Sequence, residues 1–238
     1  MDCGYFSQEL LRNNLDQTQR LLHSCPDIMK ERNLLGQSPL HLSADKPLIL
    51  RSLLALSDQK TLDGTDVSGA TALDYALYSS GLNCKSGLSC NLRCRSCGCS
   101  QSTAMLLQAD CAIISHSRLV NFVFDGASLR CKKKFIKGLK DRRDRLMALA
   151  KEKLPKSTYD SLGLVEGCVL DSQAPLVWGA LLNNGVKIPS PLALSTNSDT
   201  KVLANHWGSF YHNIFDPEDA KLLLNRGFRD IDTLGCRG

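Results

Sequence analysis

The chain has 238 residues, of which 43% are hydrophobic and 22% are charged, and its formal net charge is +5. This composition argues against a disordered chain, and no stretch approaches the roughly 18 consecutive apolar residues that span a bilayer. The small net charge does not by itself indicate nucleic-acid binding. The first 22 residues mix charges into the apolar positions, which is not typical of a secretory signal, so we expect an intracellular protein of the cytoplasm or nucleus.

The N-terminal part of the chain predicts a pair of helices followed by an internal repeat. The helices are expected near Phe6 to Arg12 and Leu15 to His23. The stretch GQSPLHLSA (residues 36–44) aligns with GATALDYAL (residues 69–77), position by position and without a gap. Repetition at a period of about 20 to 50 residues is typical of solenoids, in which neighbouring units bury each other's apolar faces.

Paired leucines predict the ends of a second set of helices. The pairs are Leu21/Leu22, Leu53/Leu54, Leu106/Leu107, Leu181/Leu182 and Leu223/Leu224. The first interval is close to the spacing of the repeat and the later ones are longer, so we expect insertions in loops of the repeat array. Helices are predicted at about residues 102–108, 174–184 and 216–227, and Gly185 is expected to end the second of them in the left-handed region.

A cysteine-rich insert is predicted at residues 80–101. In the absence of an export signal, thiols or metal thiolates are favoured over disulfides. Four cysteines with the spacing C-x3-C-x2-C-x-C are candidate ligands of a structural zinc: Cys90, Cys94, Cys97 and Cys99. Zinc sites usually combine two ligand pairs a dozen or more residues apart, whereas these four lie on one short excursion. A loosely packed loop with free thiols is therefore the alternative.

Residues 130–156 predict a long basic helix. They contain twelve Lys or Arg and three acids, a charge of +9 that leaves −4 for the rest of the chain. Apolar residues recur at helical spacing and predict a buried stripe with a basic opposite face: Phe135, Leu139, Leu146, Leu149, Ala150 and Leu154. Pro155 is expected to end the helix. The basic face is either simply solvated or a surface for an acidic partner protein; nucleic acid and membrane are disfavoured because interleaved aromatic residues are missing.

The sequence contains no recognised catalytic motif. Its five histidines are dispersed, and the patterns for phosphate-binding loops, nucleophile elbows, dinucleotide folds and helical zinc peptidases are absent. A lone histidine such as His41 is more often a structural group than a base. We therefore expect no catalysis and no cofactor apart from the candidate structural zinc.

The stretch GQSPLHLSA resembles the ankyrin signature G-x-T-P-L-H-x-A, and with the leucine pairs this resemblance covers about half the chain. The cysteine-rich insert, with AMLLQADCA, LKDRRDRL and LLLNRGFRDID after it, resembles the large, mostly uncharacterised ankyrin-repeat proteins of filamentous fungi. The resemblance implies an all-α ankyrin-repeat solenoid interrupted by a Cys-rich loop and a long basic helix. The second copy has Asp74 in place of His41, so the hydrogen bonding that the family draws from this histidine is expected to be absent there.

The resemblance also implies a three-part organisation. Residues 1–115 would form the N-terminal repeats, 116–170 the basic helical insertion, and 171–238 further repeats that we expect to be truncated. The chain is expected to be a scaffold or adaptor for a protein partner of unknown identity, bound through the concave surface. Exposed candidate contacts are Arg32, Gln37, Asp63 and Asp66. The alternative is a regulatory or targeting arm of a larger enzyme whose catalytic domain lies outside this chain.

Overall fold

The structure is a computed structural model that describes residues 4–84, 98–113, 124, 126–164, 171–194 and 217–229. Within these ranges the chain is mostly α-helical and has no β-strand, which confirms the all-α prediction. No helix of the described ranges combines the length and apolar character that a membrane span requires. The chain divides into two compact units, residues 1–111 with 117–134 and residues 112–116 with 135–238.

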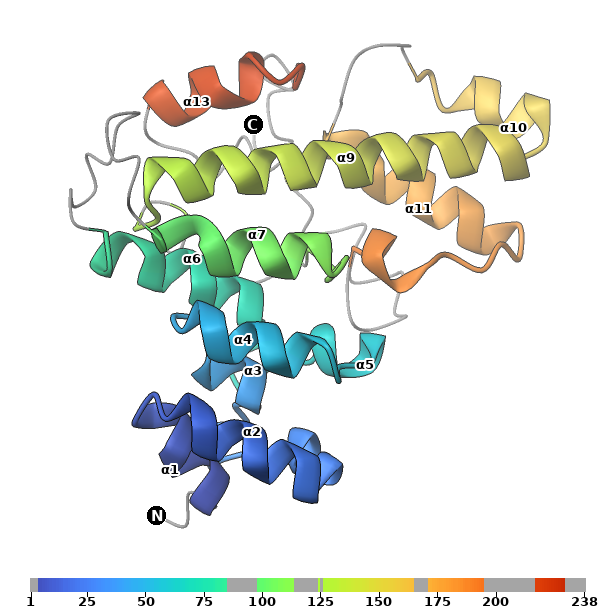
Figure 1. Cartoon of the computed structure of the whole chain (residues 1–238). Helices are drawn as coiled ribbons and strands as arrows, with labels where there is room; N and C mark the ends of the chain where they lie inside the picture. The colour runs from blue at the N-terminus through green and yellow to red at the C-terminus, as the bar shows by residue number, and fades with distance from the viewer. Residues whose placement is uncertain are drawn as a thin grey trace. The chain divides into compact units, whose positions relative to one another are not determined.

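In the first unit the helices alternate between two layers (Figure 1). The inner layer contains α1 (Tyr5–Leu11), α3 (Pro39–Leu42) and α6 (Ala72–Leu82), and the outer layer contains α2 (Leu15–Ser24), α4 (Pro47–Leu54) and α7 (Gln101–Gln108), with neighbours in contact within each layer. Two short segments, η1 (Pro26–Lys30) and α5 (Gln59–Leu62), follow α2 and α4. Gln19 on α2 donates to Ser52 on α4 at 3.3 Å, so equivalent positions of successive outer helices are spatial neighbours.

The leucine pairs fall at the ends of the outer helices, as predicted. In α2, α4 and α7 one leucine of each pair is fully buried: Leu22, Leu53 and Leu106. Helices as short as α3 and α6 are marginal in isolation. These helices are therefore stabilised by the burial of their apolar faces against the neighbouring hairpin.

The second unit is built on the long helix α9 (Leu129–Lys153), whose first residues belong to the first unit. Its other elements are α10 (Lys156–Ser161), η4 (Asp171–Gln173), α11 (Ala174–Asn183), η5 (Ser190–Leu192) and α13 (Pro217–Leu224). Leu146 and Ala150 of α9 share one apolar core with Val177 and Trp178 of α11. As predicted, α9 ends just before Pro155, and Gly185 follows α11 with φ of 70°.

The three-part organisation predicted from the sequence concerns which segments belong to repeats, and it stays a prediction.

Candidate functional site

A short turn stands before α3, and we call it finger 1 (residues 33–37). The Oδ1 atom of Asn33 accepts the backbone N–H groups of Leu35 and Gln37, at 3.0 and 2.9 Å. The Asn33 N–H donates to the Gln37 carbonyl at 3.1 Å. Gly36 adopts a φ of 73°, a conformation that glycine tolerates best. Finger 1 is therefore closed by one of its own side chains.

Finger 2 (residues 66–70) repeats this arrangement before α6. Asp66 Oδ1 accepts the N–H groups of Ser68 and Ala70, at 2.8 and 2.9 Å, and these two residues are the equivalents of Leu35 and Gln37 in the second copy of the repeat. The expectation that Asp66 is exposed is wrong: only 9% of the residue is accessible, because the carboxylate that closes the turn faces inward. Burial raises the pKa of Asp66, but hydrogen bonds from Ser68, Tyr75 and Ala70 outweigh it and hold the pKa below its usual value.

The two fingers touch at their tips. The Val67 N–H donates to the Leu35 carbonyl at 3.0 Å, a backbone bond between one finger and the next. A Cβ atom added at Gly36 would lie 3.0 Å from the Val67 nitrogen. The close approach of the fingers therefore depends on glycine at position 36.

Replacing Gly36 with alanine is expected to cost more stability than the same change at Gly69. Both glycines have positive φ, 73° and 83°, so alanine at either position is strained by about 1 kcal/mol. A Cβ at Gly69 would meet nothing within 4 Å, whereas at Gly36 it would press on the Val67 backbone. In urea denaturation we expect Gly36→Ala to lower the free energy of unfolding by about 2 kcal/mol more than Gly69→Ala. Equal losses would contradict the close packing of the fingers.

Tyr75 of α6 joins the two fingers through its hydroxyl group. The Oη atom accepts from Gln37 Nε2 at 2.6 Å and donates to Asp66 Oδ2 at 2.8 Å. Gln37 Oε1 also accepts from Asn33 Nδ2 at 2.7 Å. The predicted contact residue Gln37 is therefore half-buried and already engaged between the fingers.

His41 ties the start of α3 to finger 2. Its Nδ1 atom accepts the Ser38 N–H at 3.1 Å and lies 2.7 Å from Ser38 Oγ, while Nε2 lies 3.0 Å from the Ala70 carbonyl. Because Nδ1 accepts from a backbone N–H, the proton belongs on Nε2, which donates to Ala70. His41 is 3% exposed, and this burial lowers its pKa. The imidazole is therefore a neutral connector between repeats.

Asp74 takes over the capping part of this role at the start of α6. Its Oδ2 atom accepts from the N–H and the hydroxyl of Thr71, both at 2.8 Å, and its own N–H donates back to Thr71 Oγ1 at 3.3 Å. This reciprocal cap was not predicted, because the replacement of histidine was expected to remove the hydrogen bonds at this position. Within the described ranges, Asp74 makes no bond to a following finger.

Replacing Asp74 with asparagine is expected to stabilise the protein at neutral pH. Burial raises the pKa of Asp74 to about 6 from 3.8, so the folded state binds the proton more readily and the wild type gains stability as the pH falls from about 6 to 4. Asp74→Asn removes the charge while its amide oxygen can take the place of Oδ2. The free energy of unfolding of Asp74→Asn should exceed that of the wild type by roughly 2 to 3 kcal/mol at pH 7.5, and this difference should shrink towards pH 4.5. An advantage that does not change with pH would show that Asp74 is not the titrating group; Asp16→Asn, at an exposed position of α2, serves as the control.

Large apolar side chains are exposed at the finger tips. Leu34, Leu35 and Val67, which we call the fingertip patch, are 81%, 57% and 74% exposed. Arg32 is exposed beside them, and its Nη2 atom would lie 2.8 Å from a Cβ added at Gly64. The guanidinium therefore leans on the chain just ahead of finger 2.

The other predicted contact on this side, Asp63, is half-buried and accepts from Gln59 Nε2 at 2.8 Å.

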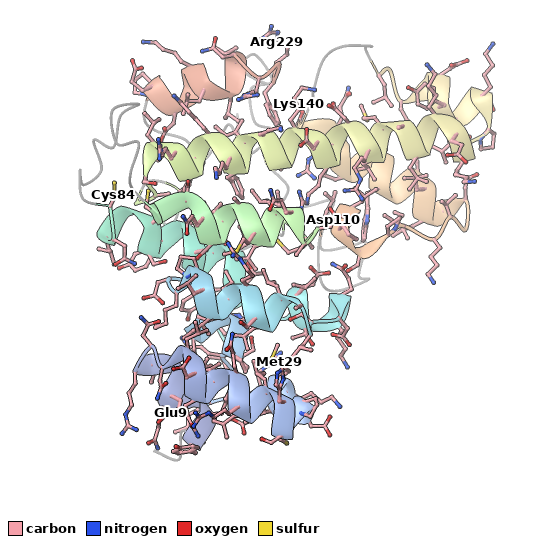
Figure 2. All side chains as sticks on the ribbon, in the orientation of Figure 1. Glu9, Met29, Cys84, Asp110, Lys140 and Arg229 are labelled. Carbon is pink, nitrogen blue, oxygen red and sulfur yellow. The ribbon has the colours of Figure 1, made fainter. Side chains whose placement is uncertain are left out.

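Of the four cysteines predicted to bind zinc, Cys90, Cys94 and Cys97 lie outside the described residues. Cys99 lies in the short helix η3 (Gly98–Ser100), with Sγ 3.3 Å from Ser128 Oγ. Cys84, labelled in Figure 2, lies just beyond the end of α6 and is buried. The described ranges contain no group of three or more side chains placed to hold a metal ion, and the zinc site stays a prediction.

The basic helix exists as predicted, but its charges are not confined to one solvated face. Most of the expected apolar stripe is buried, while Leu149 is only partly so. Arg142 and Arg143 are 4% exposed, on the same side as Leu139 and Leu146. Both arginines lie three or four residues from each leucine, so they fall within the apolar stripe of the helix. This spacing is a sequence signal that could have predicted their burial. Lys134, Lys137 and Arg145 are exposed, as predicted.

Arg143 is held by a buried ion pair in the second unit. Its Nε atom lies 2.5 Å from Asp171 Oδ1, and the two side chains are 4% and 1% exposed. By contrast, Lys140, labelled in Figure 2, pairs with Asp144 on the surface of α9. The buried pair joins η4 to α9, so it is a structural feature of this unit.

The first unit also contains a small cavity of about 220 Å³. Its lining includes Asp45, Ser79, Asn83, Cys99 and Ser102. No histidine belongs to this lining, and its carboxylate, Asp45, is paired with Lys46 at 2.6 Å. The fingers and inner helices therefore remain the better candidate site.

No family model matches the sequence, and neither curated proteins nor solved structures give a match.

Proposed function

We propose that the chain is an ankyrin-repeat protein that works as a scaffold or adaptor by binding a partner protein. The recurrence of the finger hydrogen bonds carries this proposal. Asp66 replaces Asn33 as the acceptor in the next unit. The donors Leu35 and Gln37 of finger 1 are replaced by Ser68 and Ala70, which lie the same number of residues further along the chain as Asp66 does from Asn33. A unit of about 33 residues with one turn and two helices is the ankyrin repeat. The alternating inner and outer layers support the same proposal.

A binding role is proposed in preference to catalysis because the titratable groups between the fingers serve to hold them together. His41 bonds Ser38 and Ala70, and Asp66 is occupied by Ser68, Ala70 and Tyr75. In contrast, the fingertip patch and Leu82 on the inner helix α6 remain exposed. Exposed apolar residues on a rigid support are typical of protein-interaction sites.

An intracellular location is part of the proposal. Cys25 and Cys131 are free thiols, the state that a reducing compartment maintains.

The proposal is tested by selecting ligands for the full chain from a random peptide library displayed on phage. We expect binders whose affinity falls when Leu82 or Val67 is changed to serine, because Leu82 is an exposed residue of the inner helix α6 and Val67 an exposed residue of finger 2. The matched control is Leu48→Ser, which alters a leucine of the outer helix α4 that is 62% exposed. Binding that depends on Leu48 and not on Leu82 or Val67, or a complete lack of binders, would refute the proposed surface.

A further inference from the structure

We propose that the two fingers select a partner segment that places a carboxylate on Arg32 and apolar side chains on the fingertip patch. This inference rests on the proposed function and specifies the chemistry of the partner. Two independent observations lead to it, one from the apolar tips and one from the charges beside them.

The fingertip patch is apolar and pre-organised. Leu34 and Leu35 come from finger 1 and Val67 from finger 2, and the bond from Val67 N–H to the Leu35 carbonyl holds the two tips together. Each turn is fixed from within by Asn33 or Asp66. A partner that covers these side chains gains hydrophobic free energy and orders little additional backbone.

The charge beside the patch is positive and uncompensated. Burial alone accounts for the lowered pKa of Arg32, and within the described ranges no carboxylate lies within ion-pair distance of it. Nearby Lys30 differs, because its ammonium group pairs with Asp27 at 2.6 Å. The fingers therefore present a guanidinium whose natural complement is a carboxylate, which can accept two parallel N–H groups.

The carboxylates of the fingers are not available to neutralise Arg32. Asp66 is buried and closes finger 2, and Asp63 accepts from Gln59. Within the described ranges Arg32 donates from Nη1 to the Glu31 carbonyl at 3.3 Å, so an incoming acidic side chain would meet a cation that no carboxylate neutralises.

A protein segment fits this surface better than a nucleic acid. Phosphate backbones are bound by several cations, and unpaired bases are bound by aromatic stacking. The surface offers one guanidinium and three aliphatic side chains. An acidic and apolar segment matches both parts.

The test uses peptides selected by the full chain from a random dodecapeptide phage library, with affinities measured by fluorescence anisotropy. We expect enriched sequences that contain Asp or Glu within a few positions of apolar residues. Arg32→Gln should weaken their binding about tenfold or more, and Arg32→Lys should recover only part of it because the planar fork is lost. The double change Leu35→Asn with Val67→Asn should weaken binding to a similar extent.

Matched controls separate this inference from general effects on the fold. Arg51→Gln and Leu48→Asn alter an exposed arginine and an exposed leucine on the outer helix α4, and both should leave the affinity unchanged. Selected peptides without carboxylates, or affinities insensitive to Arg32, would overturn the inference. If such peptides still depend on Leu82, the proposed function stands while this specificity fails.

A single-stranded oligonucleotide is included as a second probe. Binding of this probe that is lost in Arg32→Gln and falls steeply with salt would show that the surface takes phosphates, and it would overturn the choice of an acidic peptide.

Discussion

Replacing His41 with alanine is expected to lower the free energy of unfolding by about 3 kcal/mol. The change leaves the Ser38 N–H without its acceptor, in a site where the side chain is 3% exposed, and it removes one of the two donors to the Ala70 carbonyl, which also accepts the Asp66 N–H. It also removes the edge-to-face contact with Tyr75, whose ring centroid lies 5.4 Å from that of His41. Urea denaturation followed by circular dichroism measures the loss.

Two comparisons make the His41 prediction specific. His23→Ala removes an exposed histidine on α2 and should change stability by less than about 0.5 kcal/mol. His41→Asn places a neutral acceptor at the position that Asp74 occupies in the next unit, so it should retain the helix cap but lose the bond to Ala70. A loss in His41→Asn as large as that in His41→Ala would show that the cap contributes little.

The same site should make stability depend on pH. The pKa of His41 lies below its usual 6.5, so the unfolded chain binds this proton more readily than the folded one. Stability contributed by His41 is therefore complete above pH 6.5 and declines as the pH falls below it. The difference in free energy of unfolding between the wild type and His41→Gln should therefore narrow from pH 7.5 to pH 5. A difference that stays constant over this range would argue against titration of His41.

Replacing Asp171 with alanine is expected to destabilise the second unit by about 3 to 5 kcal/mol. The change leaves the Arg143 guanidinium in a site where it is 4% exposed, without the carboxylate that now lies 2.5 Å away. The fluorescence of Trp178, which lies in the core of this unit, reports the unfolding if Trp207 is first replaced with phenylalanine.

The double variant Arg143→Met with Asp171→Leu tests the cause of that loss. Apolar side chains of similar size remove both charges, so much of the stability should return. The control Lys140→Ala breaks the surface pair with Asp144 and should cost at most about 1 kcal/mol. If the double variant is as unstable as Asp171→Ala, the uncompensated charge is not what destabilises the protein.

The helices could be predicted because their signals are local. The leucine pairs and Gly185 after α11 each act within a few residues of the structure they determine. The regular step between the two units was also visible in the sequence, because Gly36 and Leu40 recur as Gly69 and Leu73. These features confirm the helical organisation, while the ankyrin assignment remains our proposal.

The features that were not predicted depend on side-chain hydrogen bonds, most of them local and one between distant residues. Asp66 was expected to be exposed because aspartate usually is, but its bonds to Ser68, Ala70 and Tyr75 bury it. Asp74 was treated as a lost histidine, although a carboxylate three residues after Thr71 completes a reciprocal cap. Arg143 was assigned to a solvated face because its partner, Asp171, is 28 residues away.

The bond between neighbouring fingers joins the Val67 amide to the Leu35 carbonyl, so it is indifferent to the side chains at either position. The side chains of Leu35 and Val67 themselves point into solvent, at 57% and 74% exposure. Mutations at these two positions can therefore change the exposed side chains of the fingers without removing the backbone hydrogen bond that joins them. Such a separation lets a lineage acquire new ligands at little risk to folding.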